Sequence, residues 1–188
     1  MEHPAAVDAL NLIGLQLWFE GNLSESLTMC LRARDAADRL LRRDHPVRAR
    51  TLQNLAVTTA DMGNNGDARA LQEEALAIAQ RNFGDAYHEI AGYLSDLAIS
   101  NLRLGNLQTA RRLFERALRI RETRLGTRAD LVAGVVQNLA VVDATLGDYV
   151  AARHEHRRAM RIWEKTLGPS HPYVAIALTD LASVMRDQ

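Results

Sequence analysis

Residues 154 to 160 read HEHRRAM, a segment whose histidines and glutamate are side chains that could bind a metal ion. On a helix His154 and His156 lie about 200° apart, whereas two histidines that chelate one zinc ion are four residues apart on one face. This spacing argues against a metal site, and we interpret His156 as a core-facing position filled by a polar residue. The sequence predicts no metal and no other cofactor.

The sequence shows few residue patterns that are typical of other catalytic sites. The single cysteine, Cys30, excludes an intrachain disulfide and any cysteine-based zinc site. The sequence contains no glycine-rich phosphate loop and no strand-turn-helix nucleophile motif. Acid-base pairs stay open, because Asp and Glu are common on helical surfaces. If the protein has a groove that is adapted as a catalytic or small-molecule pocket, the candidate functional residues of that pocket are Asp143, Asn101 and His88.

Eight arginines follow two successive helical patterns near residues 111 to 119 and 153 to 161. We interpret them as a solvated face that Glu115, Glu122 and Glu155 interrupt, and nucleic-acid binding is the alternative. The formal net charge of zero argues against polyanionic partners, so we expect no nucleic acid. No apolar run reaches the roughly 18 residues of a membrane span, and we expect a cytoplasmic protein. The arginines are Arg111, Arg112, Arg116, Arg119, Arg153, Arg157, Arg158 and Arg161.

The elements that position these residues follow a repeat of 42 residues. Composition favours helices, since Ala, Leu and Arg dominate and all three are strong helix formers. Each repeat has an apolar residue followed by a small one, then a glycine, and its boundary carries His-Pro at 3–4, 45–46 and 171–172. The columns are Ile13, Leu55, Leu97, Leu139 and Leu181; Gly14, Ala56, Ala98, Ala140 and Ala182; and Gly21, Gly63, Gly105 and Gly147.

Each repeat predicts two helices. In the third repeat, apolar residues from Ile90 to Leu104 recur at helical spacing, Gly105 ends that helix, and a second pattern runs from Leu107 to about Leu125-Gly126. The residue after each turn glycine, Asn or Asp, is a strong N-cap for the second helix. Pro46 and Pro172 suit the first turn of the helix that follows. A last single helix covers about 172 to 186.

These features resemble the tetratricopeptide repeat, in the 42-residue variety of kinesin light chains and many bacterial regulatory proteins. The segment YLSDLAISNLRLGNLQTARRLFERALRIRETRLG (93 to 126) carries the pair of an apolar and a small residue (Leu97-Ala98), the turn glycine and the aromatic Phe114 of that pattern. The resemblance implies an all-α, right-handed superhelical solenoid with nine helices. It would form one domain over 1–188, with repeats at about 4–45, 46–87, 88–129 and 130–171 and a capping helix at 172–186.

The sequence departs from this family at its aromatic positions. The second helices have Cys30, Gln72 and His156 where Phe114 stands in the third repeat. The first helices have Leu17, Thr59, Asn101, Asp143 and Met185 in their aromatic column. These changes do not threaten a fold whose packing is spread over many positions, but they weaken the transfer of ligand contacts from the family.

The resemblance implies that the first helix of each repeat lines a concave groove. Immediately before the core leucines stands a polar column, Asn54, Asp96, Asn138 and Asp180, and in the family asparagines at this position hydrogen-bond the backbone of an extended peptide. Asn54 and Asn138 match that residue type, whereas Asp96 and Asp180 do not. Helical spacing adds further groove candidates: Arg50, Gln53, Asp61, Ser95, Ile99, Arg103, Gln137, Val141 and Thr179.

The resemblance implies a protein or peptide partner and no enzymatic activity. The alternative is that the groove residues are solvated and bind no ligand. Trp18 and Phe19 either cap the core or anchor a partner, and we expect Trp163 to pack against the last helix. That helix has Leu178, Leu181 and Met185 as its expected packing side, and a homodimer formed through it stays open. The chain could also be a segment of a larger regulator.

Overall fold

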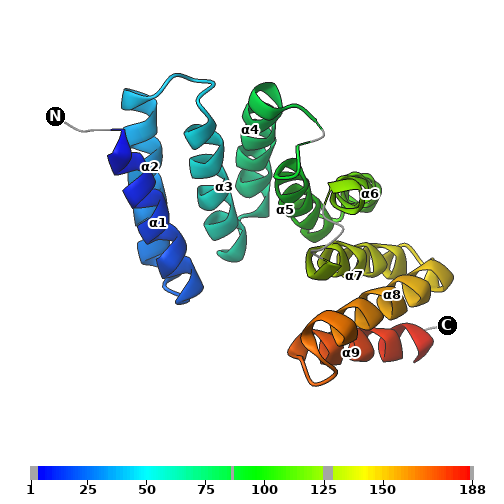
Figure 1. Cartoon of the computed structure of the whole chain (residues 1–188). Coiled ribbons are helices and arrows are strands. Elements are labelled where there is room, and N and C mark those ends of the chain that lie inside the picture. Colours follow the sequence, from blue (N-terminus) through cyan, green and yellow to red (C-terminus); the bar gives the residue numbers. More distant parts are fainter. Residues whose placement is uncertain (1–3, 86, 125–128, 187–188) are drawn as a thin grey trace. The chain divides into compact units, whose positions relative to one another are not determined.

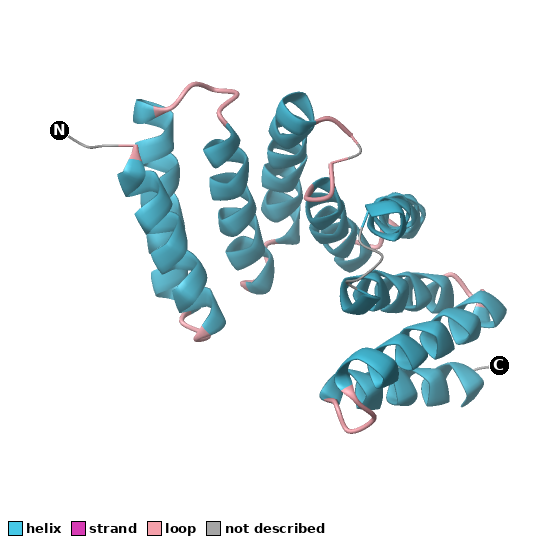
Figure 2. Ribbon diagram, in the orientation of Figure 1, coloured by secondary structure: helices cyan, strands magenta, loops and turns pink. Residues whose placement is uncertain are grey.

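The computed structural model describes residues 4–85, 87–124 and 129–186, apart from the side chains of Arg124 and Ala129 (Figures 1 and 2). Every regular element in these ranges is a helix, so the all-α prediction is confirmed. His3, Leu125 and Gly126 lie outside the described residues. The helices are α1 (Ala5–Phe19), α2 (Leu23–Leu40), α3 (Pro46–Asp61), α4 (Asn65–Phe83), α5 (Ile90–Arg103), α6 (Leu107–Arg124), α7 (Ala129–Thr145), α8 (Tyr149–Leu167) and α9 (Pro172–Arg186).

Consecutive helices pack against one another within two units, Met1–Leu104 and Gly105–Gln188. The first unit contains α1 to α5, with α1 against α2 and α3 against α4 (Figure 1). The first helices of its repeats also touch each other, since α1 contacts α3 and α3 contacts α5. The second unit contains α6 to α9, where α7 packs against α8 and α8 against α9. The predicted single domain over 1–188 stays a prediction.

The turns between the two helices of a repeat depend on glycine. Gly21, Gly63, Gly105 and Gly147 all have φ between 77° and 92°, a left-handed conformation in which a Cβ atom is strained. The cap that follows is only partly as predicted. Asp148 accepts a hydrogen bond from the Ala151 backbone N–H at 3.1 Å, but the N-caps of α2 and α4, Asn22 and Asn64, make no such side-chain bond.

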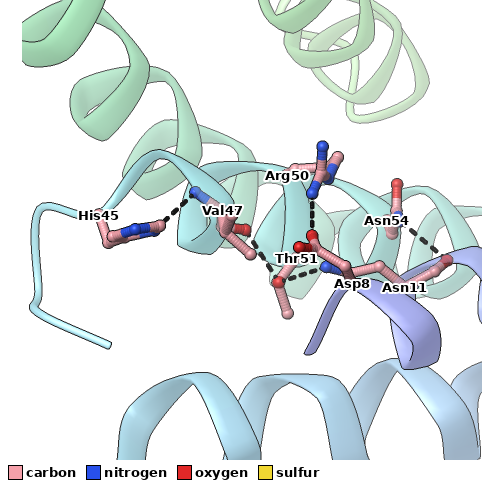
Figure 3. Close-up of polar contacts among 7 residues, drawn as sticks. All are labelled: Asp8, Asn11, His45, Val47, Arg50, Thr51 and Asn54. Atoms are coloured by element: carbon pink, nitrogen blue, oxygen red, sulfur yellow. Dashed lines mark hydrogen bonds and ion pairs between the residues drawn. The ribbon is translucent and has the colours of Figure 1, made fainter. Parts of the chain in front are cut away.

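The His-Pro pairs begin first helices in a specific way. His45 is the N-cap of α3, and its Nδ1 accepts a hydrogen bond from the backbone N–H of Val47 at 3.2 Å (Figure 3). His171 Nδ1 accepts one from the Tyr173 N–H at the same distance. Each imidazole thus satisfies an otherwise orphan backbone donor of the first turn, while the proline needs none.

Small residues let the paired helices approach closely. Ala56, Ala98 and Ala140 are completely buried, as their column predicts. The first repeat has Gly14 in this column, and a Cβ atom built there would lie 2.9 Å from Cys30 Sγ on α2. An alanine at this position would therefore require the Cys30 side chain to shift.

The last helix packs through a set of residues that differs from the expected one. Trp163 is 4% exposed and packs with Val174 and Ala177 of α9, which confirms its predicted role. Leu181 is buried as predicted. Leu178 and Met185 are 49% and 55% exposed, so placing them on the packing side was wrong. Their helical phase turns them away from α8, and Val174, Ala177 and Val184 supply the contact instead.

Candidate functional site

A groove of about 520 Å³ lies in the first unit, along the first helices of its three repeats. α1, α3 and α5 supply its walls, whereas the second helices contribute only Cys30 from α2 and Gln72 from α4. We call this hollow the first-unit groove. The predicted groove residues that line it are Gln53, Asn54, Asp96, Ile99 and Arg103.

The aspartates of the polar column that precedes the core leucines bond to glutamines of the preceding repeat. Gln53 Nε2 donates a hydrogen bond to Asp96 Oδ2 on the next first helix. In the second unit Gln137 Nε2 donates to Asp180 Oδ2 at 2.6 Å, in the same relation of 43 residues. These bonds tie α3 to α5 and α7 to α9. Two aspartates that the sequence offered as groove residues therefore also join consecutive repeats.

The side chain of Asn54 is hydrogen-bonded to the neighbouring repeat. Its Nδ2 donates to the backbone carbonyl of Asn11 on α1 at 3.3 Å (Figure 3). The buried Asn11 in turn donates to Thr51 Oγ1 at 2.8 Å, and Arg50 is paired with Asp8 at the exposed edge (Figure 3). The bond to Asn11 fixes the orientation of the Asn54 amide. Arg50 does not line the first-unit groove.

The mouth of the groove carries an indole and an ion pair. Trp18 Nε1 donates to Asp61 Oδ2 at 2.8 Å, and Arg103 Nη1 lies 3.2 Å from Asp61 Oδ1. Arg103 also donates to the Ala60 carbonyl at 3.2 Å. Trp18 thus lines the groove and links two repeats, while Phe19 beside it is 70% exposed. The charges at this mouth already neutralise each other.

The remaining predicted groove residues are placed less favourably for a ligand. Ser95 is buried, and its hydroxyl donates to the Ala91 carbonyl at 2.7 Å. Gln137 is 6% exposed and bonds His156 Nδ1 at 2.9 Å as well as Asp180. Burial lowers the pKa of His156, which favours the neutral ring beside Gln137. Asn138 and Val141 are half-buried on α7.

The three candidates for an adapted catalytic pocket do not meet in the first-unit groove. Asn101 is buried and donates to the Leu97 carbonyl at 2.8 Å, and His88 is exposed before α5. Neither lines the groove. Asp143 lies in the second unit, where it is 1% exposed and its Oδ1 is 3.0 Å from Arg111 Nε. The groove therefore does not bring these three groups together.

Asp143 also shares a hydrogen bond with Glu155 of α8. Burial, followed by the charge of Asp143, raises the pKa of Glu155 to about 8, and burial raises the pKa of Asp143 as well. A protonated Glu155 can donate to the Asp143 carboxylate, which Arg111 faces from α6. Placing Glu155 among the solvated glutamates was therefore wrong, because its helical phase turns it toward α7.

Other arginines of α6 and α8 do pair with surface glutamates. Arg158 is paired with Glu122, and Arg111 Nε lies 3.5 Å from Glu115 one turn further along α6. Both pairs are partly exposed, so each contributes little to stability. Within the described ranges no group of three or more His, Cys, Asp or Glu could hold a metal ion. None of the described helices has the length and apolar composition that crossing a bilayer requires.

Sequence reasoning missed the bottom of the first-unit groove. Four of its lining residues are buried and carry a polar group or a thiol, and we call them the polar floor. The signal was present in the aromatic column, where smaller side chains replace Phe114 in the first two repeats, but it suggested only weakened ligand transfer. The polar floor consists of Cys30, Thr58, Gln72 and Ser100.

Comparisons with known proteins agree with this architecture. A family model described as tetratricopeptide repeat matches residues 6–79, 53–123 and 132–188. A solved structure from Podosopora anserina, described as a kinesin light chain with nearly identical TPR-like repeats, has a TM-score of 0.82 at 21% identity over 99% of this chain and 88% of its own.

Two further structures are similar. BtubC (BKLC) from P. vanneervenii has a TM-score of 0.81 at 22% identity, over 97% of this chain and 73% of its own. The apo form of RapI has a TM-score of 0.75 at 16% identity, over all of this chain and half of its own. No curated protein sequence matches the chain. At these identities the structures show the fold alone, a tandem array of helix pairs like that of kinesin light chains.

Proposed function

Because the chain belongs to the tetratricopeptide-repeat family, we propose that it is a protein-interaction module without catalytic activity. Its ligand is an extended peptide or a partner's helix, held against the first helices of the repeats. The first-unit groove carries this proposal, since it is a hollow of about 520 Å³ that α1, α3 and α5 line with mixed polar and apolar side chains.

The composition of the groove suits a peptide backbone with apolar side chains. Asn54 offers an amide whose position its bond to Asn11 already restricts, and less conformational entropy is lost when a preorganised group binds. Leu15, Val57 and Ile99 supply apolar wall surface. Asn138 occupies the equivalent repeat position on α7 of the second unit, where it is half-buried.

A library of random peptides displayed on phage tests this proposal. Peptides selected on the unaltered chain should lose at least tenfold in affinity for the Asn54→Ala, Asn138→Ala double variant, measured by isothermal titration calorimetry. The melting temperature should stay nearly unchanged, because within the described residues the two substitutions remove one side-chain hydrogen bond, from Asn54 to the Asn11 carbonyl. Gln108→Ala, at an exposed position of α6, is the matched control. Undiminished binding by the double variant removes the groove from the proposal.

Self-association through α9 is a second candidate, because this helix exposes apolar side chains. Tyr173, Ile176, Leu178 and Met185 are each about half exposed, at 50%, 49%, 49% and 55%. By helical spacing Leu178 and Met185 share one side of α9 and Tyr173 and Ile176 share another, and exposed apolar side chains of this kind can contact a second protein. Light scattering after size exclusion should give a dimer mass that Ile176→Glu reduces to a monomer. A monomer mass for the unaltered chain at high concentration would eliminate this candidate.

A further inference from the structure

The polar floor exists because two repeats lack a large residue between their helices. In the third repeat Phe114 fills the corresponding position of the second helix and is fully buried. The first two repeats have Cys30 and Gln72 there, and both line the first-unit groove. Neither side chain has the volume of a phenyl ring. The hollow therefore extends from the wall of the groove toward the outer helices.

Two atoms of the polar floor have no hydrogen-bond partner within the described part of the chain. They are Gln72 Oε1 and Ser100 Oγ, and the two residues are 2% and 0% exposed. The other buried hydroxyls of this unit are satisfied, for example Ser95 by the Ala91 carbonyl and Thr58 by the Asn54 carbonyl. A buried polar group without a partner is costly and uncommon in a folded protein.

The second unit does not repeat this arrangement. The positions equivalent to Thr58 and Ser100 are Val142 and Val184, which are buried and apolar. His156, at the position of Gln72, has its Nδ1 bonded to Gln137. The unsatisfied polar floor is thus specific to the first unit, where it opens into a hollow large enough for a side chain.

The surroundings of the polar floor select an uncharged group. Val57 and Ile99 are apolar wall residues. The charged side chains at the mouth, Asp61 and Arg103, are paired with each other, and Gln53 bonds Asp96. None of the four polar-floor residues has a carboxylate, ammonium or guanidinium group, so a charged ligand group that reached Gln72 and Ser100 would leave water without a counter-ion beside it, which is unfavourable.

We propose that the polar floor binds an uncharged side chain of the partner whose tip both donates and accepts a hydrogen bond. The tip donates to Gln72 Oε1 and accepts from the hydroxyl of Ser100. A primary amide, as in glutamine, and a phenol, as in tyrosine, both have this chemistry. The proposal rests on the proposed function, because it names the kind of residue that a bound peptide would insert into the first-unit groove.

Small side-chain mimics test it without knowledge of the peptide. The full chain, labelled with ¹⁵N, is titrated with propionamide and with 4-methylphenol, and the side-chain amide of Gln72 and the backbone amide of Ser100 are followed by NMR. At least one of the two should give saturable shifts. Propionate, propylammonium and toluene, which are charged or purely apolar, should bind at least tenfold more weakly.

Variants distinguish the polar floor from the rest of the groove. Ser100→Ala should weaken binding of the preferred mimic at least fivefold without lowering the melting temperature, because it removes a hydroxyl that has no partner in the fold. Gln72→Phe, which introduces the residue of the third repeat, should abolish binding. The matched control is Ser95→Ala, on the same helix but outside the groove, which should leave binding unchanged.

Several results would overturn the proposal. If neither propionamide nor 4-methylphenol gives saturable shifts, the polar floor binds only water. If toluene or propionate binds as tightly as the preferred mimic, the polar floor does not select an uncharged group that donates and accepts hydrogen bonds. If selected peptides bind but neither mimic does, the polar floor fails while the proposed function stands. If a mimic binds but no displayed peptide does, the proposed function fails and the polar floor is a small-molecule site.

Discussion

Glu155 makes the stability of the second unit depend on pH in a direction that can be worked out. Its pKa is about 8 in the folded chain against 4.5 for an ordinary glutamate, because burial and the charge of Asp143 both disfavour ionisation. Between these two pH values the unfolded chain has lost a proton that the folded chain still holds. Stability therefore falls as pH rises through this window, by at most about 1.4 kcal/mol per pH unit for one proton.

The variant Glu155→Gln isolates this effect. Glutamine is uncharged at every pH and keeps an N–H that can donate to Asp143, so it mimics the protonated glutamate. Between pH 6 and pH 8 we expect the free energy of unfolding of the unaltered chain to fall by about 1–2 kcal/mol relative to the variant. This is less than the limit of about 1.4 kcal/mol per pH unit, because water reaches the half-buried Glu155 and weakens the effect of burial. The pKa of His156 is lowered in the folded chain, so its contribution to stability is lost as pH falls. This effect is present in both proteins and cancels in the comparison.

Fluorescence of Trp163 can follow this unfolding, because the side chain is buried in the second unit. Introducing Trp18→Phe into both proteins leaves it as their only tryptophan. Urea titrations at several pH values then give the free energy of unfolding for each protein. A difference between the two that stays constant from pH 6 to pH 8 would show that Glu155 is already ionised beside Asp143, and the reasoning would be refuted.

Two further predictions concern packing and turns. Gly63→Ala should destabilise the chain by about 1–2 kcal/mol, because Gly63 has φ of 92°, whereas Gly134→Ala, inside α7 with open space around its Cα, should stabilise it by up to about 1 kcal/mol. Urea titrations measure both, and effects of the same sign would contradict the assignment of these backbones. Ala98→Leu should cost about 1–3 kcal/mol, since Ala98 is completely buried between helices. An unchanged melting temperature for this variant would show that α5 is looser than its burial indicates.

The helices were predictable because their signals are local and recur. Gly63 and its equivalents mark the turns in every repeat, and Pro172 fixed the start of the last helix, which runs to Arg186 as expected. The conformation of these glycines depends on adjacent backbone atoms. A single sequence with a 42-residue period is sufficient for such features.

The candidate site was less predictable because it depends on contacts between repeats. The pattern placed Gln53 and Asp96 on the groove side of successive helices, but it could not show that they bond to each other. Glutamate is a residue type common on protein surfaces, and the burial of Glu155 is explained only by the position of Asp143 on α7. The hollow at Gln72 follows from a difference in side-chain volume, which periodicity does not measure.

A crystal structure of the chain with a selected peptide tests the central claim most directly. The account predicts an extended peptide or a helix along α1, α3 and α5, with a ligand polar group within hydrogen-bond distance of Asn54. A peptide lying on the outer helices α2 and α4, with the first-unit groove containing only water, would contradict it.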